Sequence, residues 1–260
     1  MAKDVETGGV LAASWRNARG AVGFFTRLPV RSDDASADAL AFAPVAGVVI
    51  GTMAAGILLA GHAATDEATV AAILAVAGSL LLTGALHEDG LTDVFDAMGA
   101  RQRDRRLAIM RDSRIGTYGV CALVSALALR TLLLAALLRL DGLVASTALV
   151  AAAALSRGLC LWPLHRLAPA RHEGLGTWAM GHSLRRLAVA LAMGGSVVAV
   201  CGLISGTPVA MIVAGLIAIA VAEGSSRAAR HLFGGHTGDV AGATQQLTEL
   251  AFLLTLLICR

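Results

Sequence analysis

Charged residues are scarce in this sequence, and aromatic residues are scarcer still. Charged residues make up 15% of the chain and aromatic residues 4%, whereas about a quarter of an ordinary soluble domain is charged. Hydrophobic residues reach 57%, and the mean hydropathy is +0.73. A soluble fold of 260 residues could not bury so many apolar side chains and keep a polar surface. This composition excludes an ordinary soluble protein and predicts a polytopic membrane protein.

The sequence also lacks the cysteine and histidine spacings that are typical of zinc sites. Its first residues do not form a signal peptide, and no linker rich in proline, serine or charge divides it. We therefore expect one membrane-embedded domain over residues 1–260, with residues 1–38 as an N-terminal interfacial segment. Four cysteines lie far apart in apolar runs and are expected to be buried, reduced thiols: Cys121, Cys160, Cys201 and Cys259.

Long apolar runs are what the sequence does contain. A membrane-spanning helix needs roughly 20 mostly apolar residues, and about seven runs qualify, so we expect an all-α helical membrane bundle. Before them, Val10–Arg27 carries apolar residues at helical spacing with arginines between, which predicts an interfacial helix ending at Pro29. The last two runs are short, which leaves open a re-entrant or strongly bent course for one of them. The predicted spans are Ala39–Ala63, Ala68–Leu86, Gly116–Leu138, Leu143–Leu164, Leu187–Ile204, Pro208–Ala222 and Leu247–Cys259.

Basic residues fall almost entirely on one side of these predicted spans. Of the 21 lysines and arginines, 17 lie in the N-terminal segment or in the loops after the second, fourth and sixth spans. The positive-inside rule places these segments in the cytoplasm and predicts a multi-pass protein of a bacterial inner membrane. Two arginines lie inside spans. Arg130 is near the far end of its span and is expected to snorkel, whereas Arg157 lies in the cytoplasmic half, where a phosphate-binding role is expected.

An acidic stretch marks the cytoplasmic end of the second predicted span. Asp89, Asp93 and Asp96 follow i, i+4, i+7 spacing, so their carboxylates share one helix face. Mg²⁺ typically binds one or two carboxylates together with waters and substrate phosphates. A solvated acidic helix start is the alternative, but acidic groups at membrane depth are costly, which favours a metal site. His87 is either a base or hydrogen-bond donor beside Asp89, or a structural histidine of the interface.

An arginine-rich stretch follows, over residues 101–114. Its first part is explained by contact with anionic lipid. Arg111 and Arg114 are explained less well in this way, because they flank Asp112 and lead directly into a span. Guanidinium groups bind phosphate bidentately. With carboxylates and Mg²⁺ nearby, these two arginines would complete a diphosphate clamp.

A glycine-rich stretch precedes the last predicted span. Gly234 and Gly235 lead into Thr237, Gly238 and Asp239. Backbone N–H groups in such a loop can face an anion, although no Gly-Lys-Ser/Thr follows, so it is not a P-loop. Its predicted cytoplasmic side matches the acidic and arginine-rich stretches.

Taken together, these stretches resemble the cobalamin synthase family, also called adenosylcobinamide-GDP ribazoletransferases. The segments that carry the resemblance occur in the family's order and cover nearly the whole chain: Phe25–Val30, Gly84–Asp93, Ile109–Gly116, Ser156–Gly158, Glu173–Gly176 and Gly234–Asp239. The resemblance implies a magnesium-dependent membrane transferase. It would join adenosylcobinamide-GDP to α-ribazole or its 5′-phosphate, releasing GMP.

The motifs and the resemblance together predict a set of site residues and partners. Besides the two substrates, the lipid bilayer is the expected partner and nucleic acid is not; a homo-oligomer or a complex with other corrinoid-assembly enzymes is left open. We expect catalytic roles for Asp89, Asp93, Asp112 and His87, and metal binding by Asp89, Asp93 and Asp96. Substrate binding is expected of Arg27, Arg111, Arg114, Arg157, Thr237, Gly238 and Asp239.

Two alternatives come from other protein classes. A CDP-alcohol phosphatidyltransferase also places aspartates at a helix end, but its longer aspartate spacing is absent here. An ion-coupled transporter usually places its acidic groups near the membrane midplane, whereas here acids and bases gather at one membrane face. The sequence therefore favours the transferase.

Overall fold

The computed structural model describes residues 2–30, 37–171 and 184–260. Within these ranges the chain is helical, with a single isolated backbone bridge between Pro169 and His236 and no strand. The predicted contact segment Glu173–Gly176 lies outside the described residues. The helices are α1 (Ala2–Phe25), η1 (Ala37–Phe42), α2 (Ala43–Thr65), α3 (Ala68–Thr83), α4 (Leu86–Met98), α5 (Arg103–Ile109), α6 (Thr117–Leu140), α7 (Gly142–Leu159), α8 (Leu161–Arg166), α10 (Leu184–Ile204), α11 (Pro208–Phe233) and α12 (Gly238–Ile258).

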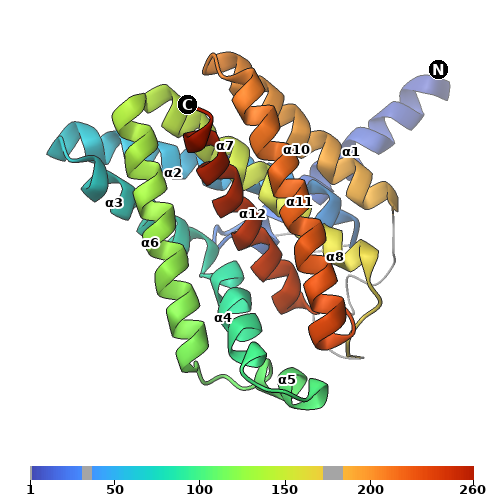
Figure 1. The fold of residues 1–260 in the computed structure, drawn as a ribbon. Coiled ribbons are helices and arrows are strands. Elements are labelled where there is room, and N and C mark those ends of the chain that lie inside the picture. The colour runs from blue at the N-terminus through green and yellow to red at the C-terminus, as the bar shows by residue number, and fades with distance from the viewer. Residues whose placement is uncertain (1, 31–36, 172–183) are drawn as a thin grey trace.

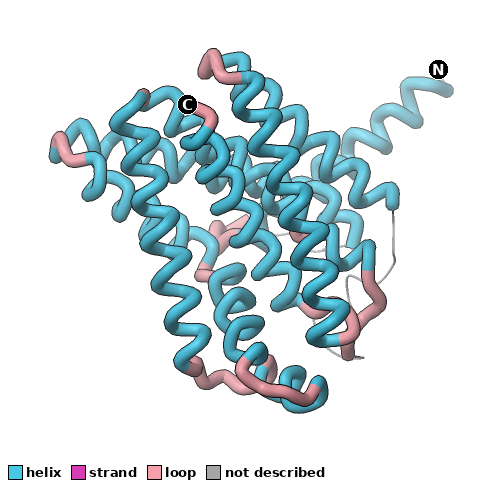
Figure 2. Tube along the Cα trace, in the orientation of Figure 1, coloured by secondary structure: helices cyan, strands magenta, loops and turns pink. Residues whose placement is uncertain are grey.

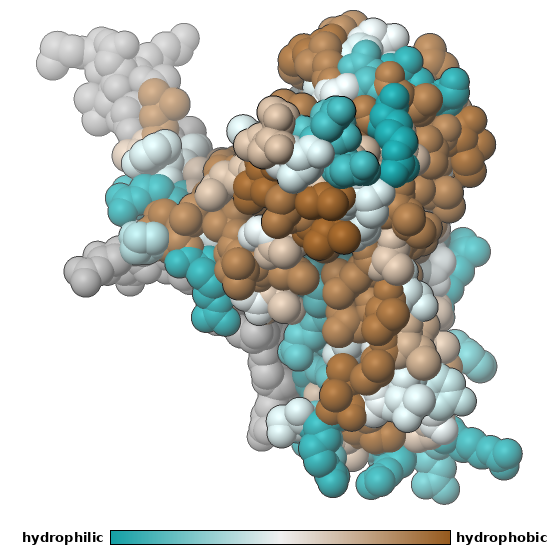
Figure 3. Space-filling view, turned by 90° about the vertical axis from the view of Figure 1, so that its left-hand side faces the viewer, coloured by the Kyte–Doolittle hydropathy of each residue, from teal (hydrophilic) through white to brown (hydrophobic). Residues whose placement is uncertain are grey.

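The described helices confirm a polytopic helical membrane protein. Six segments are long and apolar enough to cross a membrane, and a seventh is counted if α3 and α4, bent by 91° relative to each other, form one broken span. Figure 3 shows apolar residues over most of one face, with hydrophilic residues gathered chiefly toward its ends. Loops likewise lie at opposite ends of the bundle, and α4, α5 and the α11–α12 turn share one end (Figures 1 and 2).

Helix α7 forms the centre of the bundle. Nearly all its residues from Val144 to Leu159 are buried, and many are alanines. Gly47 and Gly51 of α2 allow close approach, because a Cβ at Gly51 would lie 2.6 Å from the Cα of Val150. Small residues of this kind let membrane helices approach closely. Glycine and alanine therefore serve tight helix contacts at this interface.

Several predicted boundaries were wrong. The second span does not run unbroken to Leu86, because Gly84 and Ala85 both have positive φ (64° and 56°) and separate α3 from α4. The last two spans are not short, since α11 has 26 residues and α12 has 21. The prediction of four buried thiols was correct for Cys160 and Cys201 only; Cys121 and Cys259 lie on the protein surface.

Candidate active site

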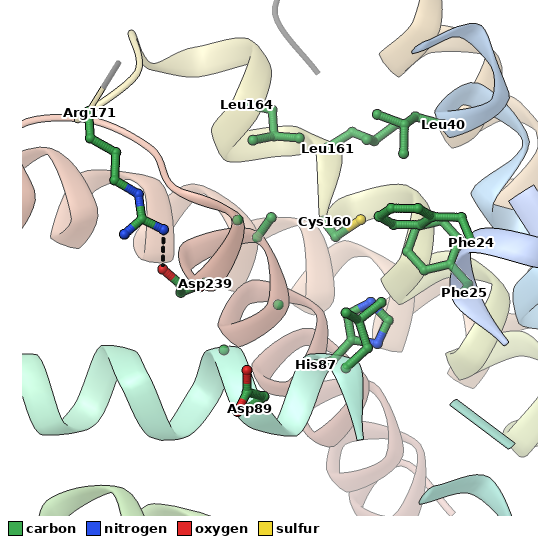
Figure 4. A pocket seen from close by; sticks show the side chains of 15 residues that line it. Phe24, Phe25, Leu40, His87, Asp89, Cys160, Leu161, Leu164, Arg171 and Asp239 are labelled. Carbon is green, nitrogen blue, oxygen red and sulfur yellow. Dashed lines mark hydrogen bonds and ion pairs between the residues drawn. The ribbon is translucent and has the colours of Figure 1, made fainter. Parts of the chain in front are cut away.

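A cavity of about 180 Å³ opens where helices from both ends of the sequence meet. Its walls come from the end of α1, η1, the first turn of α4, α8, the first turn of α12 and the segment that follows α8. Apolar side chains line one end of the cavity, whereas Asp89, Arg171 and Asp239 lie at the other (Figure 4). We call this cavity the amphipathic pocket. It brings together four predicted site residues: His87, Asp89, Gly238 and Asp239.

The break between α3 and α4 places the acidic residues at this pocket. A side chain at Gly84 would collide with the guanidinium group of Arg27, and the Arg27 backbone N–H donates to the Leu82 carbonyl over 2.7 Å. Arg27 was predicted to bind substrate, but in the structure it packs against the turn itself. Because α4 starts anew after this turn, Asp89 in its first turn faces the pocket.

The charged end of the pocket joins α4 to α12. Arg171 forms an ion pair with Asp239, with 3.0 Å between Nη2 and Oδ2. Gly90 lets the two helices touch, since a Cβ there would lie 2.8 Å from the Asp239 carbonyl oxygen. This glycine thus allows close helix approach at the pocket wall. Asp93 lies within electrostatic reach of Asp239 and Asp89.

Asp96 has a different surrounding from Asp89 and Asp93. Its Oδ2 accepts the Gly116 backbone N–H and its Oδ1 accepts the Gly119 N–H, each over 2.7 Å. Gly116 and Gly119 lie at the start of α6, where N–H groups have no partner within the helix. Asp96 therefore ties α4 to the N-terminus of α6, and both its oxygens are engaged there.

The N-terminus of α12 forms one wall of the charged end. Thr237 is buried and caps the helix, accepting the Val240 N–H at 3.2 Å. The preceding loop is held by paired backbone bonds, from His236 N to Ala168 O and from Ala170 N to His236 O, both 2.9 Å. The His236 N–H is thus bonded within the protein and does not face the pocket, while the first turn of α12 does.

His87 lies at the apolar end of the pocket. Its ring stacks on Phe25, with centroids 5.6 Å apart and planes 20° apart. The residue is buried, and its Nδ1 has no hydrogen-bond partner among the described residues. Buried polar atoms usually have a partner, so this nitrogen is a candidate for contact with a ligand.

A buried network of charges lies beneath the pocket. Arg130 Nη2 lies 2.7 Å from Glu249 Oε1, and Arg130 Nη1 lies 3.5 Å from Glu88 Oε1. Arg157 lies 3.7 Å from Glu249, and Gln246 donates to Glu88 at 3.0 Å. The snorkelling predicted for Arg130 was wrong, because its side chain is only 4% exposed and faces these acids. Arg157, expected to bind phosphate, is likewise enclosed in this network, which links α4, α6, α7 and α12.

The predicted arginine clamp lies outside the amphipathic pocket. Arg114 folds back on Asp112, with 2.6 Å between Nη2 and Oδ2, and its side chain is 86% exposed. Hydrogen bonds from Arg114 lower the pKa of Asp112 to about 2. Asp112 is thus a weak base at neutral pH. The residues that line the pocket do not include Asp112, Arg111 or Arg114.

Two arginines that were expected to contact lipid have structural partners instead. Arg103 Nε donates to the Phe233 carbonyl at 2.7 Å, and Arg106 Nη1 donates to the Leu232 carbonyl at 3.0 Å. These carbonyls end α11, where acceptors lack partners within the helix. The arginines therefore fix the turn that leads into α12.

Sequence reasoning missed the pocket's arginine and its aromatic wall. Arg171 appeared only as one of many basic loop residues, although its pairing with Asp239 places it at the charged end. Phe24 and Phe25 belonged to the predicted interfacial helix, and no role was expected of Cys160. One signal could have indicated the aromatic wall. Phe25 stands in the same motif as Arg27, and the contact of Arg27 with the turn before α4 brings the end of α1 to the start of α4.

The carboxylates in and beside the pocket meet some of the requirements of a magnesium site. Among residues 2–30, 37–171 and 184–260, no three His, Cys, Asp or Glu side chains form a group arranged to hold a metal. Asp89, Asp93 and Asp239 nevertheless lie close enough for their charges to interact. Mg²⁺ commonly uses one or two carboxylates and completes its shell with water and phosphate oxygens. The donor set fits that mode of binding and does not form a closed protein cage.

The fold and the pocket define a polytopic membrane protein whose site combines an apolar wall with carboxylates and an arginine. Residues 17–257 match the protein family described as Cobalamin-5-phosphate synthase. The chain belongs to this family.

Similar proteins from three bacteria carry one name, adenosylcobinamide-GDP ribazoletransferase. The protein of Azorhizobium caulinodans is 46% identical over 248 residues, which cover 92% of this chain and 94% of the relative. That of Xanthobacter autotrophicus is 44% identical over 256 residues, covering 92% and 94%. That of Sinorhizobium medicae is 39% identical over 248 residues, covering 92% and 95%. No solved structure matches the chain.

Proposed function

We propose that this protein joins adenosylcobinamide-GDP to α-ribazole or its 5′-phosphate. The products are adenosylcobalamin, or its 5′-phosphate, and GMP. The family match and the names of the relatives support this reaction over a CDP-alcohol transferase or a transporter. One observation supports placing the reaction at this pocket: Asp89 and Asp239, which lie far apart in the sequence, line it together with Arg171.

The proposed reaction breaks the phosphoanhydride bond of the donor and forms a phosphate ester bond to the acceptor. The 3′-hydroxyl oxygen of ribazole attacks the phosphorus attached to cobinamide, forming a new O–P bond. The P–O bond to GMP breaks, and GMP leaves with the electron pair. A carboxylate of the Asp89 and Asp93 pair accepts the hydroxyl proton. Positioning and electrostatic stabilisation supply most of the rate in such transfers.

Charge is the main demand that the diphosphate places on the site. Arg171 offers a planar guanidinium fork that suits phosphate oxygens. The N-terminus of α12 adds a positive partial charge at the same wall. Asp89 and Asp93, with Asp239, would hold Mg²⁺, which when bound neutralises the diphosphate and the leaving GMP. Asp96 is left out of this set because its oxygens hold α6.

The pocket is proposed to face the cytoplasm of a bacterial inner membrane. Most basic residues fall in segments that the positive-inside rule assigns to one side. The arginine-rich segment around α5 lies at the same end of the bundle as α4 and the α11–α12 turn (Figure 1). A cytoplasmic site would receive two water-soluble substrates.

Release of GMP by purified protein tests the proposal. Protein in detergent is supplied with adenosylcobinamide-GDP, α-ribazole and Mg²⁺, and each component is omitted in turn. GMP should form only with both substrates and should stop when a chelator removes the cation. Asp104→Asn, at an exposed position of α5, provides a matched control for Asp89→Asn. Absence of GMP with the parent protein, or equal rates for the two variants, would contradict the proposal.

A further inference from the structure

We propose that the apolar end of the amphipathic pocket binds the aromatic base of the acceptor nucleoside, with His87 Nδ1 as the partner of the base's free ring nitrogen. This inference rests on the proposed function and assigns one substrate to one half of the pocket. The acceptor's base is a dimethylbenzimidazole, a flat bicyclic ring with methyl groups at its far edge.

The size of the pocket selects the smaller substrate. Pockets for drug-sized ligands usually measure about 300–1,000 Å³, whereas this cavity measures about 180 Å³. A corrin ring with its side chains cannot enter it. One bicyclic base is of the right scale, with its sugar reaching toward the charged end.

The chemistry of the wall separates this base from the other base in the reaction, the guanine of the donor. Phe24, Phe25, Leu40, Leu161 and Leu164 surround the apolar end. The only polar side chains that the described residues place there are His87 and Cys160, and the Cys160 thiol already donates to the Arg157 carbonyl. Guanine carries several donors and acceptors, and each would lose its water without gaining a partner. A benzimidazole nucleoside has one free ring nitrogen to satisfy.

The position of His87 provides that one partner. Its ring is buried and stacked on Phe25, and Phe24 meets Phe25 edge to face with centroids 4.9 Å apart. A base entering here would add to this group of aromatic rings, whose contacts favour stacked and edge-to-face geometries. His87 is one of the residues that line the pocket, and its buried Nδ1 has no hydrogen-bond partner among the described residues.

This orientation also directs the nucleoside for reaction. With the base at the apolar end, the ribose points toward Asp89 and Asp239 at the charged end (Figure 4). The attacking hydroxyl is then held beside the carboxylates. The apolar end would thus determine which acceptor is used, and the charged end would carry out the transfer.

Inhibition by the free base tests the inference on the unmodified protein. In the GMP assay, 5,6-dimethylbenzimidazole should compete with α-ribazole and should not compete with adenosylcobinamide-GDP. Competition with the donor, or no inhibition at concentrations well above the KM for ribazole, would overturn the assignment. Failure of the parent protein to release GMP would contradict the proposed function itself, so the two outcomes are distinct.

Variants then locate the base. Leu164→Trp narrows the apolar end and should raise the KM for ribazole by about 10- to 200-fold, the range over which apolar pockets discriminate. The KM for adenosylcobinamide-GDP should stay within about twofold. Leu203→Trp, at an exposed site (72%) near the end of α10, is the matched control. A raised KM for the donor instead, or no change in either KM, would assign the pocket to the donor or to a lipid chain.

His87→Phe tests the hydrogen bond while keeping an aromatic ring against Phe25. We expect the KM for ribazole to rise about tenfold with kcat unchanged, as for the loss of a contact made equally before and during reaction. A fall in kcat at constant KM, with an altered pH profile, would instead show that His87 carries a proton and would overturn its role as a base-binding residue.

Discussion

The buried network of Glu88, Arg130, Arg157 and Glu249 allows a quantitative prediction. Two positive and two negative side chains balance each other in the interior, and Glu249 contacts both arginines. In Glu249→Gln the size of the side chain is kept and one negative charge is removed. Within this network of described residues, Arg130 and Arg157, at 3% and 2% exposure, then keep Glu88 as their one acidic neighbour, paired with Arg130 and within electrostatic reach of Arg157.

Breaking a buried ion pair by removing one partner costs about 3–5 kcal/mol, because an uncompensated charge stays buried. We expect Glu249→Gln to lower the free energy of unfolding by that amount. Glu223→Gln is the matched control: Glu223 lies on α11 and pairs with Arg166 and Arg227, whose side chains are 50% and 79% exposed. Exposed pairs contribute about 0–1 kcal/mol, and the amide oxygen of glutamine can still accept the Trp162 indole N–H, so the control should lose no more than that.

Unfolding of purified protein by SDS in mixed micelles, followed by far-UV circular dichroism, measures both losses. Adding Arg130→Gln to Glu249→Gln restores the balance of charge. The loss of unfolding free energy in the double variant should therefore be smaller than the sum of the losses in the two single variants. Equal losses for Glu249→Gln and Glu223→Gln, with additive effects in the double variant, would refute a charge-balanced network.

Five variants test the site and the topology. Asp89→Asn should abolish GMP release without affecting membrane insertion. Asp96→Asn should retain measurable turnover and weaken the start of α6 by about 0.5–2 kcal/mol, the cost of losing a cap. Equal activities of the two variants would contradict a catalytic role for Asp89 and a structural role for Asp96. Arg171→Lys replaces a fork by a point charge and should slow GMP release by about 30- to 1000-fold, equivalent to about 2–4 kcal/mol. Arg114→Lys, outside the pocket, should change the rate of GMP release less than about threefold. A larger loss of rate in Arg114→Lys than in Arg171→Lys would assign the diphosphate to Arg114. Ser113→Cys should resist a membrane-impermeant thiol reagent in intact cells when Cys121 and Cys259 are replaced by serine; efficient labelling would reverse the orientation.

The helical architecture could be predicted because it depends on local composition. Apolar runs of sufficient length identify spans wherever they occur, and the family resemblance carried by Gly84–Asp93 and Ile109–Gly116 was confirmed. Span ends were harder to predict where polar residues interrupt a helix. The sixth predicted span ended at Ala222, just before Glu223, yet α11 continues to Phe233. Glu223 accepts hydrogen bonds from Trp162 and Arg166 of the neighbouring helix α8.

The site was predicted only in part, because its contacts join residues far apart in the sequence. Spacing alone places Asp89, Asp93 and Asp96 on one helix face, but it cannot show that the N–H groups of α6 occupy Asp96. Likewise, Arg130 looked able to reach the membrane surface until its partner Glu249, on another helix, was known. Pairings of this kind depend on tertiary structure and leave no local signal.

The meeting of α4 with α12 has a consequence for synthesis of the protein. Asp89 is translated early and Asp239 late, and Gly90 is packed directly against the backbone of Asp239. During translation the reactive pocket therefore lacks a wall until the segment that begins α12 leaves the ribosome. A nascent chain stalled before that point would carry inserted helices but no place for the nucleoside to react. Enzyme activity would begin only when the ribosome has made the last described helix.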